Sequence, residues 1–331
     1  MPVSSQLEPV RTSPIEACYV GKKDAAEVLP TSWREAGHGA FTVTVQWPEE
    51  HAFYVEDGSY RPLLVTESQR QAVILLSHVV HDVPIGHRLS WGGVQCTVNP
   101  DALWVGAGPA DVELTVTPVS VKRRRGGSVM FVSRVTAVRD GQFLGSGEFQ
   151  FGTHPPAIYD RLRGSYADAR AAFARALAPT PPVMPLLVGR TSAKDVVLSA
   201  TDTANQWLYR IDTTHTVLYD HPHDHIPGMA LLEAVDQIAR TTPGGAGPFA
   251  YDTTFHQYVE FDRPCLLRVE PALPDEVGRS RLLVHAFQSD RPVLSCMVTT
   301  AAGPLLDALP SQAAWASGGA GIGRGVASAV V

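Results

Sequence analysis

Two apolar helical segments with polar residues at matching places dominate the hydrophobic pattern of the chain. The first, from Pro62 to about His81, is apolar on nearly every side in its second half. In the second, 228–240, apolar residues surround Glu233, and Thr-Thr-Pro-Gly-Gly at 241–245 ends the helix. A helix that is apolar most of the way round is buried in a core. The pattern therefore predicts two central helices, each enclosed by other elements.

Strand-like segments follow each of these helices, with alternating apolar and polar residues. They are 87–98, 112–120, 128–139 and 142–151 in the first half, and 255–261, 265–270, 280–289 and 292–300 in the second. Shorter alternating segments, 39–47, 203–212 and 214–219, come before the helices. Asp140-Gly141 indicates a tight hairpin. A central helix followed by a four-stranded meander, twice, predicts an α+β fold in which a curled antiparallel sheet wraps each helix.

The two halves carry the same landmarks in register. Each has a Pro or Gly at the helix opening, a glutamate five residues later and a glutamine four residues after that. The matches are Pro62, Glu67 and Gln71 in the first half, and Gly228, Glu233 and Gln237 in the second, all 166 residues apart. Val20-Gly21-Lys22 likewise matches Val188-Gly189-Arg190 at an offset of 168. Ordered matches of this kind indicate an internal duplication, packed as a pseudo-dimer.

Prolines and composition suggest where the halves divide. A surface helix is expected at 160–176, and Pro179, Pro181, Pro182 and Pro185 follow it as a stiff linker. The expected divisions are a first domain at 16–160, a linker at 161–187 and a second domain at 188–305. We expect residues 1–15 and the Gly/Ala-rich tail, 306–331, to be disordered.

Charge and cysteine usage exclude several classes of function. The net charge of −6 and a pI near 6.0 argue against a nucleic-acid-binding protein, which needs a basic face. The cysteines, Cys18, Cys96, Cys265 and Cys296, lack metal or disulfide spacing, as expected of free thiols in a reducing cytoplasm. No signal peptide and no apolar run of 18 residues is visible, so we expect a cytoplasmic protein that does not cross a membrane. No cofactor-binding motif is present.

The segments around the helix openings resemble a known family. His-Pro…Pro-Gly-x4-Glu at 221–233 is similar to the active-site segment of the β-hydroxyacyl carrier-protein dehydratases, which have the hotdog fold. Two such units, with Gln-Trp-Pro-x-x-His-x-Phe-Tyr at 46–54 and Glu-x-x-Arg-Gln at 67–71, resemble the A-factor biosynthesis (AfsA-type) family of actinobacteria. The resemblance covers about 18–300 and implies a double hotdog. It also implies transfer of a β-ketoacyl group from an acyl-carrier-protein thioester to a hydroxyl of dihydroxyacetone phosphate, in γ-butyrolactone biosynthesis.

The chemistry of acyl transfer suggests roles for the matched residues. Glu67 or Glu233 is the candidate base, with a pKa raised by apolar surroundings, and His51 and His221 assist or orient. The free N–H groups of the helix openings suit a thioester carbonyl. Carried over from hotdog dimers, His221 pairs with Glu67 and His51 with Glu233, and the sequence leaves open which site works. The candidate substrate-binding residues are Pro62, Arg70, Gln71, Pro227, Gly228, Met229, Asp236 and Gln237.

One residue departs from the family pattern. Members commonly repeat Glu-x-x-Arg-Gln in both halves, but the second half here has Asp236 where the arginine is expected. On a helix Asp236 projects near Glu233, so we expect two acids that raise each other's pKa and repel a phosphate. A phosphorylated acceptor is then expected beside Arg70, aided by Lys22 or Arg190.

Other interpretations of the same residues remain open. A hotdog dehydratase or thioesterase, or a non-catalytic acyl-binding protein, fits the same pattern, and so does a homodimer. The acids and histidines at 215–225 match no familiar ligand set, so no metal is predicted. Lys122–Arg125 is a solvated hairpin tip or a docking patch for an acidic carrier protein. Gly145-x-Gly147 lies inside a hairpin and therefore predicts no dinucleotide site.

Overall fold

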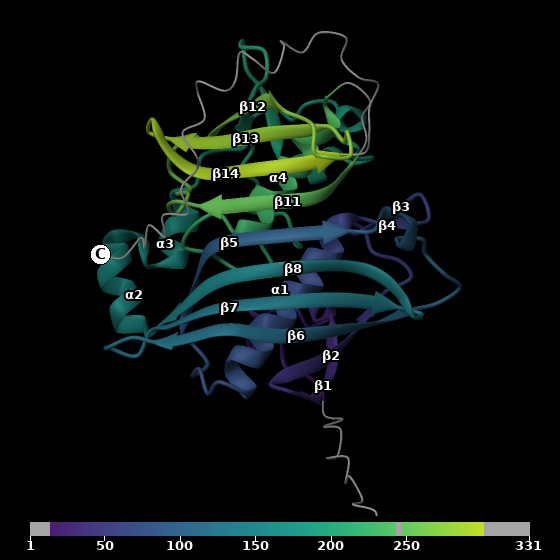
Figure 1. The fold of residues 1–331 in the computed structure, drawn as a ribbon. Helices are drawn as coiled ribbons and strands as arrows, with labels where there is room; N and C mark the ends of the chain where they lie inside the picture. The colour runs from purple at the N-terminus through teal and green to yellow at the C-terminus, as the bar shows by residue number, and fades with distance from the viewer. Residues whose placement is uncertain (1–13, 243–246, 301–331) are drawn as a thin grey trace, which may run out of the picture.

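The computed structural model describes residues 14–242 and 247–300, which form two similar halves along one sheet (Figure 1). Residues 1–13 and 306–331, where disorder was expected, lie outside the described residues. The same holds for 243–245 of the segment expected to end the second helix. Within the described residues, no helix is long and apolar enough to cross a membrane.

The elements appear in the same order in each half. The first half contains η1 (Ala17–Val20), η2 (Ala25–Glu27), β1 (Pro30–Gly37), β2 (Ala40–Trp47), β3 (Val55–Glu56), β4 (Ser59–Tyr60), α1 (Pro62–Val79), β5 (Arg88–Val98), η3 (Pro100–Ala102), β6 (Ala110–Arg123), β7 (Val129–Arg139) and β8 (Gln142–His154). The linker contains α2 (Pro156–Arg163), η4 (Gly164–Tyr166) and α3 (Ala169–Ala174). The second half contains η5 (Pro185–Val188), η6 (Ala193–Asp195), β9 (Leu198–Ala200), β10 (Gln206–Tyr209), α4 (Gly228–Arg240), β11 (Pro248–Phe255), β12 (Leu266–Ala272), β13 (Arg281–Gln288) and β14 (Arg291–Thr300).

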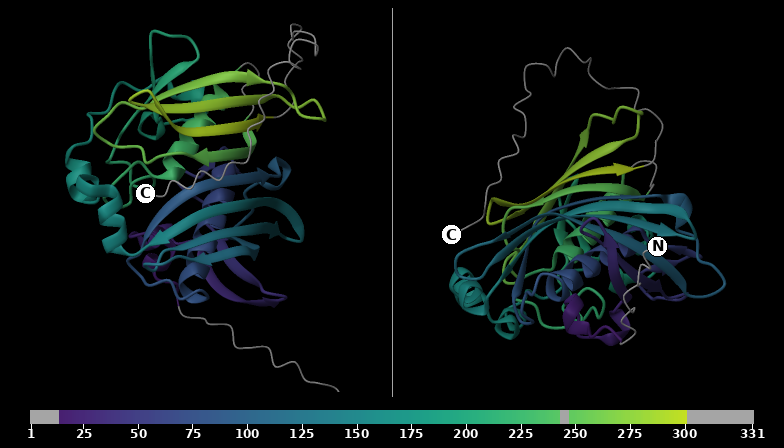
Figure 2. Two further views of the ribbon diagram at one scale, coloured as in Figure 1. Left: turned by 60° about the vertical axis from the view of Figure 1, so that its left-hand side comes forward. Right: turned by 60° about the horizontal axis from the view of Figure 1, so that its bottom comes forward.

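A single antiparallel sheet of 12 strands joins the halves. Outward from its centre, one side runs β5-β8-β7-β6-β2-β1 and the other β11-β14-β13-β12-β10-β9, so corresponding strands lie at corresponding places. β5 pairs with β11 across the centre, with Cys96 opposite Tyr251. The sheet curls around α1 and α4, which lie on its concave side (Figure 2). This is a double hotdog, as the sequence predicted.

α1 is buried on every side, because the curled sheet and the second half enclose it. Each residue from Leu63 to Ser77 is buried, including a polar run from Thr66 to Gln71. Buried polar groups need partners, and Trp47 Nε1 supplies one by donating to Ser68 Oγ at 2.8 Å. Burial of a polar run inside an otherwise apolar helix marks this face of α1 as a candidate functional surface.

Several predicted elements are wrong in place or type. The expected helix at 160–176 is broken into α2 and α3, because Gly164 turns the chain with φ +55 and Asp168 caps a new helix. Residues 214–219 form turns, where alternation of apolar residues predicted a strand. The strand expected at 255–261 lies at 248–255 instead, because pairing with β5 sets its place. The short or polar strands β1, β3, β4 and β9 were not predicted.

Glycines in β8 let α1 lie close to the sheet. A Cβ at Gly147 would fall 2.5 Å from Gln69 Oε1 and 2.9 Å from the Phe149 ring, whereas one at Gly92 would meet nothing nearer than 3.5 Å. The Gly145-x-Gly147 pair is therefore a packing feature of the helix–sheet contact, inside the β7–β8 hairpin as predicted.

Gly147→Ala is expected to lower the free energy of unfolding by about 1–3 kcal/mol, because the added methyl overpacks the contact with α1. Denaturant titration followed by circular dichroism measures this. Gly92→Ala, on the neighbouring strand β5, is the matched control and should change stability by less than about 0.5 kcal/mol. Equal effects in the two variants would show that α1 does not depend on close approach at Gly147.

Candidate active site

Each central helix carries a buried glutamate held by the same kind of network. In the first half, Gln71 Nε2 donates to Glu67 Oε1 at 2.8 Å and to the Glu27 carbonyl at 2.8 Å. Gln71 Oε1 accepts from the Leu29 N–H at 2.9 Å. Lys22 Nζ, from the end of η1, lies 3.3 Å from Glu67 Oε1. The glutamine thus fixes the glutamate to the segment that precedes β1.

The second half repeats this network residue by residue. Gln237 Nε2 donates to Glu233 Oε1 at 2.6 Å and to the Asp195 carbonyl at 2.8 Å, and its Oε1 accepts from Val197 N–H at 3.0 Å. Arg190, which matches Lys22 in sequence, lies 2.6 Å from Glu233 Oε2 through Nη2. Identical bonding at residues 166 apart gives the repeat a structural basis.

The histidine that corresponds to His51 is His215. His51 Nδ1 accepts from the N–H groups of Phe53 and Tyr54 at 3.1 Å each, and its Nε2 lies 3.3 Å from Glu27. His215 Nδ1 accepts from the N–H groups two and three residues later, at 3.3 and 3.1 Å, and its Nε2 lies 3.2 Å from Asp195. The match of His51 to His221 was therefore wrong.

Arg70 and Lys22 determine the charge state of Glu67. Arg70 donates from Nε and Nη2 to the two carboxylate oxygens at 2.7 and 2.8 Å. Burial raises the pKa of the Glu67 carboxyl, but the charges of Arg70 and Lys22 and the hydrogen bonds from Arg70 and Gln71 outweigh it, and the pKa falls to about 2. The expectation of a raised pKa was wrong, because the sequence did not show this bidentate pairing. A carboxylate with so low a pKa is a poor general base at neutral pH.

Asp236 is enclosed by cations instead of facing a second acid. Arg61 Nη2 donates to its carboxylate at 2.9 Å and Arg240 Nε at 2.7 Å, and the Tyr251 hydroxyl donates at 3.1 Å. Burial raises the pKa of Asp236, but Arg240 and Arg61 hold it well below its ordinary value. The prediction that Asp236 and Glu233 raise each other's pKa was therefore wrong. Arg61 comes from the first half, at the start of α1, and also donates to the Gly189 carbonyl at 2.7 Å.

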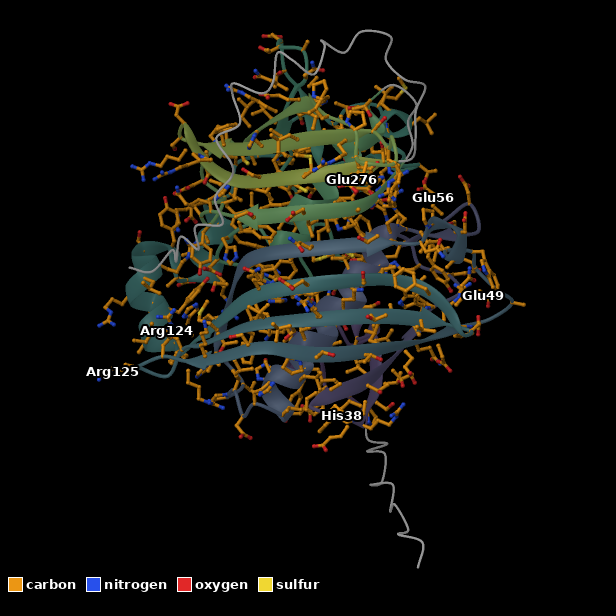
Figure 3. All side chains as sticks on the ribbon, viewed as in Figure 1. His38, Glu49, Glu56, Arg124, Arg125 and Glu276 are labelled. Atoms are coloured by element: carbon orange, nitrogen blue, oxygen red, sulfur yellow. The ribbon has the colours of Figure 1, made fainter. Side chains whose placement is uncertain are left out.

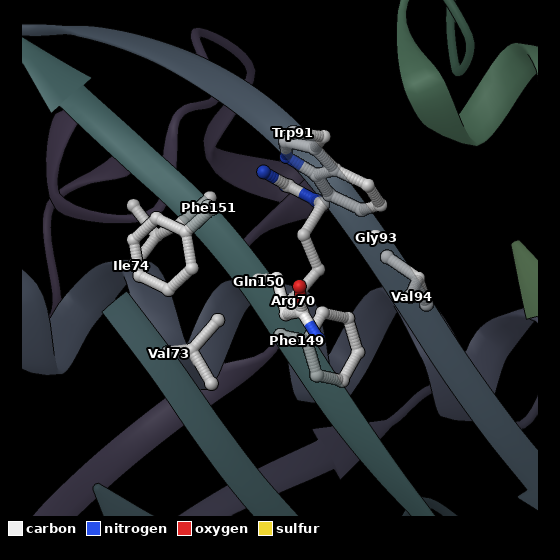
Figure 4. A pocket seen from close by; sticks show the side chains of 9 residues that line it. All are labelled: Arg70, Val73, Ile74, Trp91, Gly93, Val94, Phe149, Gln150 and Phe151. Atoms are coloured by element: carbon white, nitrogen blue, oxygen red, sulfur yellow. The ribbon is translucent and has the colours of Figure 1, made fainter. Parts of the chain in front are cut away.

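A narrow apolar pocket lies beside Arg70 (Figure 4). It has about 190 Å³ of empty space between α1 and strands β5 and β8. Its lining is Arg70, Val73, Ile74, Trp91, Gly93, Val94, Phe149, Gln150 and Phe151. One guanidinium at the mouth of an apolar space suits a ligand with an anionic end and an aliphatic chain.

At the corresponding helix positions of the second half, the groups are polar and joined to each other. Asp236 stands at the place of Arg70, and Arg240 at the place of Ile74. Arg240 packs so closely that a Cβ at Gly189 would fall 2.6 Å from its Cδ. The ion pairs of Asp236 with Arg240 and Arg61 thus occupy the side of α4 that corresponds to the pocket-facing side of α1.

The histidine-rich loop of the second half reaches the glutamate site of the first. His221 Nδ1 lies 2.7 Å from Asp220 Oδ1, and Asp220 Oδ2 accepts from the Lys23 N–H at 2.7 Å. Lys23 follows Lys22, which contacts Glu67, so the expected pairing of His221 with the Glu67 site agrees with these contacts. His51 contacts Glu27 of its own half. The group from its loop that reaches the Glu233 site is the Phe53 carbonyl, which accepts from Arg190 at 2.7 Å.

The opening of α4 lies against the pocket wall. A Cβ at Gly228 would fall 3.2 Å from the Trp91 ring, so glycine is needed for this approach. The described residues include no hydrogen-bond acceptor for the N–H groups of Gly228 and Met229, which begin the helix after Pro227. At the opening of α1, Pro62 has no N–H, and its neighbour Arg61 is bound to Asp236. Only the α4 opening therefore combines free donors with an adjacent pocket among the described residues.

The basic run Lys122–Arg125 ends β6 and forms the tip of the β6–β7 hairpin (Figure 3). The Arg124 N–H donates to the Ser128 carbonyl at 2.7 Å, and Gly126 and Gly127 have positive φ angles of 90 and 91. The tip also lies near α2, because a Cβ at Gly126 would be 3.5 Å from Ile158. The predicted solvated hairpin is present.

Four residues of the two networks escaped the sequence analysis. Glu27 and Asp195 lie 168 residues apart, the offset of Lys22 and Arg190, so extending the repeat would have found them. Arg61 and Tyr251 carry no such signal, because their partner Asp236 is reached only through tertiary packing.

Comparison with known proteins places these features in a family context. The model of the A-factor biosynthesis hotdog domain (AfsA) matches residues 4–154 and 172–303. A 2-oxo-3-(phosphooxy)propyl 3-oxoalkanoate synthase of Streptomyces virginiae is 36% identical, covering 87% of this chain and 98% of its own. Proteins of the same name from Streptomyces coelicolor and Streptomyces griseus are 32% and 33% identical, covering 88% and 82% of this chain and 92% and 91% of theirs.

Glu67→Gln is expected to reduce acid-sensitive stability. The folded-state pKa of Glu67 is depressed to about 2, so its contribution is present above its ordinary value of 4.5 and is lost as pH falls toward 2. The variant should lose about 3–5 kcal/mol at pH 7, since Arg70 is left unpaired, and its stability should change less between these pH values. Chemical unfolding across that range measures both. Glu113→Gln, at an exposed ion pair with Arg34, is the control, and matching profiles would contradict the account.

Proposed function

The chain belongs to the A-factor biosynthesis (AfsA) hotdog family, and from this premise we propose that it is an acyltransferase that makes a 3-oxoalkanoate ester. The name of its relatives describes the ester of a 3-oxoalkanoic acid with a 2-oxo-3-(phosphooxy)propyl group. The proposed reaction moves a 3-oxoacyl group from an acyl-carrier-protein thioester to the free hydroxyl of dihydroxyacetone phosphate. The identity with the Streptomyces virginiae protein over nearly all of that protein's length is the observation that carries the proposal.

We place the reaction at the first-half site, around Glu67. The pocket beside Arg70 supports this choice, since it offers an apolar space of about 190 Å³ next to a cation. In the second half, Asp236, Arg240 and Arg61 bind one another at the corresponding place. Opening that site would break buried ion pairs, which costs several kcal/mol. Glu233 and Gln237 then maintain the fold of their half and the ordering of Arg190.

In the proposed mechanism His221 is the general base. Asp220 holds Nδ1 of its ring at 2.7 Å, which leaves Nε2 to take the proton of the acceptor hydroxyl. The oxygen attacks the thioester carbonyl, and the N–H groups of Gly228 and Met229 hold the oxyanion that forms. Collapse of the tetrahedral intermediate breaks the C–S bond, and His221 returns the proton to the departing thiolate.

Arg70 and Lys22 supply the positive charge for the phosphate of the acceptor. Both contact Glu67, at 2.7 and 3.3 Å, and this carboxylate positions them with a low pKa that keeps it ionised. Glu67 and Gln71 are thus positioning residues in this proposal, and so is His51, whose ring is fixed by two backbone N–H groups and Glu27. A guanidinium suits phosphate because it donates two parallel hydrogen bonds.

The acyl carrier protein, as donor, would meet a basic surface. Lys122–Arg125 projects from the sheet at the hairpin tip, with Arg124 and Arg125 exposed (Figure 3). Carrier proteins are acidic, and charges of opposite sign accelerate and orient such encounters. We therefore propose this tip as the docking patch.

His221→Ala is expected to lower kcat about 100-fold or more, because the transfer loses its base. His225→Ala, on the same loop but bonded to Asp224, should stay within about threefold of the wild type. Mass spectrometry of the acyl carrier protein and of the ester product, with and without acceptor, measures both rates. Thiol release that does not depend on an acceptor would favour a thioesterase instead, and equal rates in the two variants would remove His221 from the mechanism.

Arg70→Lys is expected to raise KM for a phosphorylated acceptor on the order of tenfold, because one charged hydrogen bond is lost. KM for a glycerol-like acceptor without phosphate should not change. Asp236→Asn, at the corresponding position of the second half, is the control and should leave both KM values unaltered. Steady-state kinetics with the acceptor pair, plus competition by inorganic phosphate, tests this. An unchanged ratio of the two KM values in Arg70→Lys would contradict phosphate binding at the first-half site.

A further inference from the structure

Three side chains in the loop before α4 bring donor atoms together at one point. They are Asp220, His221 and His223, and their donor atoms all lie within 4.8 Å of one another. His221 Nδ1 is 2.7 Å from Asp220 Oδ1, and His223 Nε2 is 3.9 Å from the same oxygen. We propose that this cluster binds a divalent transition-metal ion, with Zn²⁺ as the best fit.

His223 is the residue for which a ligand accounts best. Its side chain is 22% exposed, and it lies among the rings of Phe173, Tyr219 and His221. Within the described residues its ring nitrogens make no hydrogen bond, and Asp220 at 3.9 Å is its nearest charged partner. An imidazole largely withdrawn from water without a partner is costly, whereas a metal ion would use its lone pair.

The present distances bracket those of a tetrahedral site. Bonds of roughly 2.0–2.1 Å place the donor atoms of such a site about 3.4 Å apart. The Asp220–His221 distance of 2.7 Å must therefore open and the Asp220–His223 distance of 3.9 Å must close, each by less than 1 Å. Side-chain rotations suffice for both changes, because neither ring is held by any other hydrogen bond in the described residues.

The surroundings also support Asp220 as a ligand. Its second oxygen accepts from the N–H groups of Lys23 and Asp24, at 2.7 and 3.4 Å, which fixes the carboxylate. The nearby charge of Lys22 is balanced by Glu67 and Glu27, at 3.3 and 3.9 Å. Two imidazoles and one carboxylate suit Zn²⁺, Co²⁺ or Cu²⁺ better than Mg²⁺ or Ca²⁺, which prefer all-oxygen sites.

Metal binding would fasten the loop of the second half to the first. Asp220 already contacts Lys23, so a metal on Asp220, His221 and His223 would stabilise that contact. It would also occupy His221, so the ion would inhibit acyl transfer. The inhibition rests on the proposed function, but binding of the metal does not.

Isothermal titration of tag-free, chelator-treated full-length protein with ZnCl₂ tests the binding. The expected result is one ion per chain, with a Kd on the order of micromolar or tighter and a raised Tm. His223→Ala should weaken this binding at least about 100-fold, while His225→Ala, on the same loop but outside the cluster, should leave it within about threefold. Co²⁺ should give visible absorption bands in the wild type and in His225→Ala only.

Two outcomes would overturn the metal site. One is no saturable binding below about 100 μM, and the other is equal binding in His223→Ala and the wild type. An inhibition assay separates this proposal from the mechanism, because Zn²⁺ should inhibit the wild type and not His223→Ala. Binding without inhibition would retain the metal site and remove His221 from the reaction.

Discussion

The rest of the structure depends on the compensation of a buried carboxylate in the middle of each central helix. Glu67 is 2% exposed and Glu233 is fully buried, so each must be paired and hydrogen-bonded to remain ionised. A cation from the preceding 3₁₀ helix and a glutamine one turn later meet this need in both halves. These bonds tie the helix to the segment before the sheet, and they therefore set the place of every group around the site.

The two copies of this network have come to differ in one residue, and the difference accounts for the asymmetry of the protein. Where the first half has Arg70, which pairs with Glu67 beside a pocket, the second has Asp236. An aspartate there needs cations, and Arg61 and Arg240 supply them by filling the space. One copy thus retains a place for substrate, and the other becomes a contact between the halves. The histidine loop of the second half in turn completes the first site, so neither half is sufficient alone.

Much of the fold could be predicted from the sequence, because it depends on local pattern. The bounds of α4 at 228–240, the second-half meander from β12 to β14, and the glutamate–glutamine register all follow from periodicity and repeat spacing. The charge state of Glu67 did not follow, since the sequence contains the carboxyl and the arginine but not their distance. The match of His51 to His215 was missed because it lies two residues out of register, at an offset of 164. The turns at 214–219 alternate like a strand, yet they form around the hydrogen bonds of His215.

The central claim is that one chain has one working site, in the first half. Titration with a non-hydrolysable 3-oxoacyl-pantetheine amide, with hydrogen exchange read on the same samples, tests it most directly. The account predicts one ligand per chain, with protection at α1, β5 and the opening of α4, and loss of binding when Ile74→Trp fills the pocket. Two ligands per chain, or protection around Asp236 and Arg240, would contradict it.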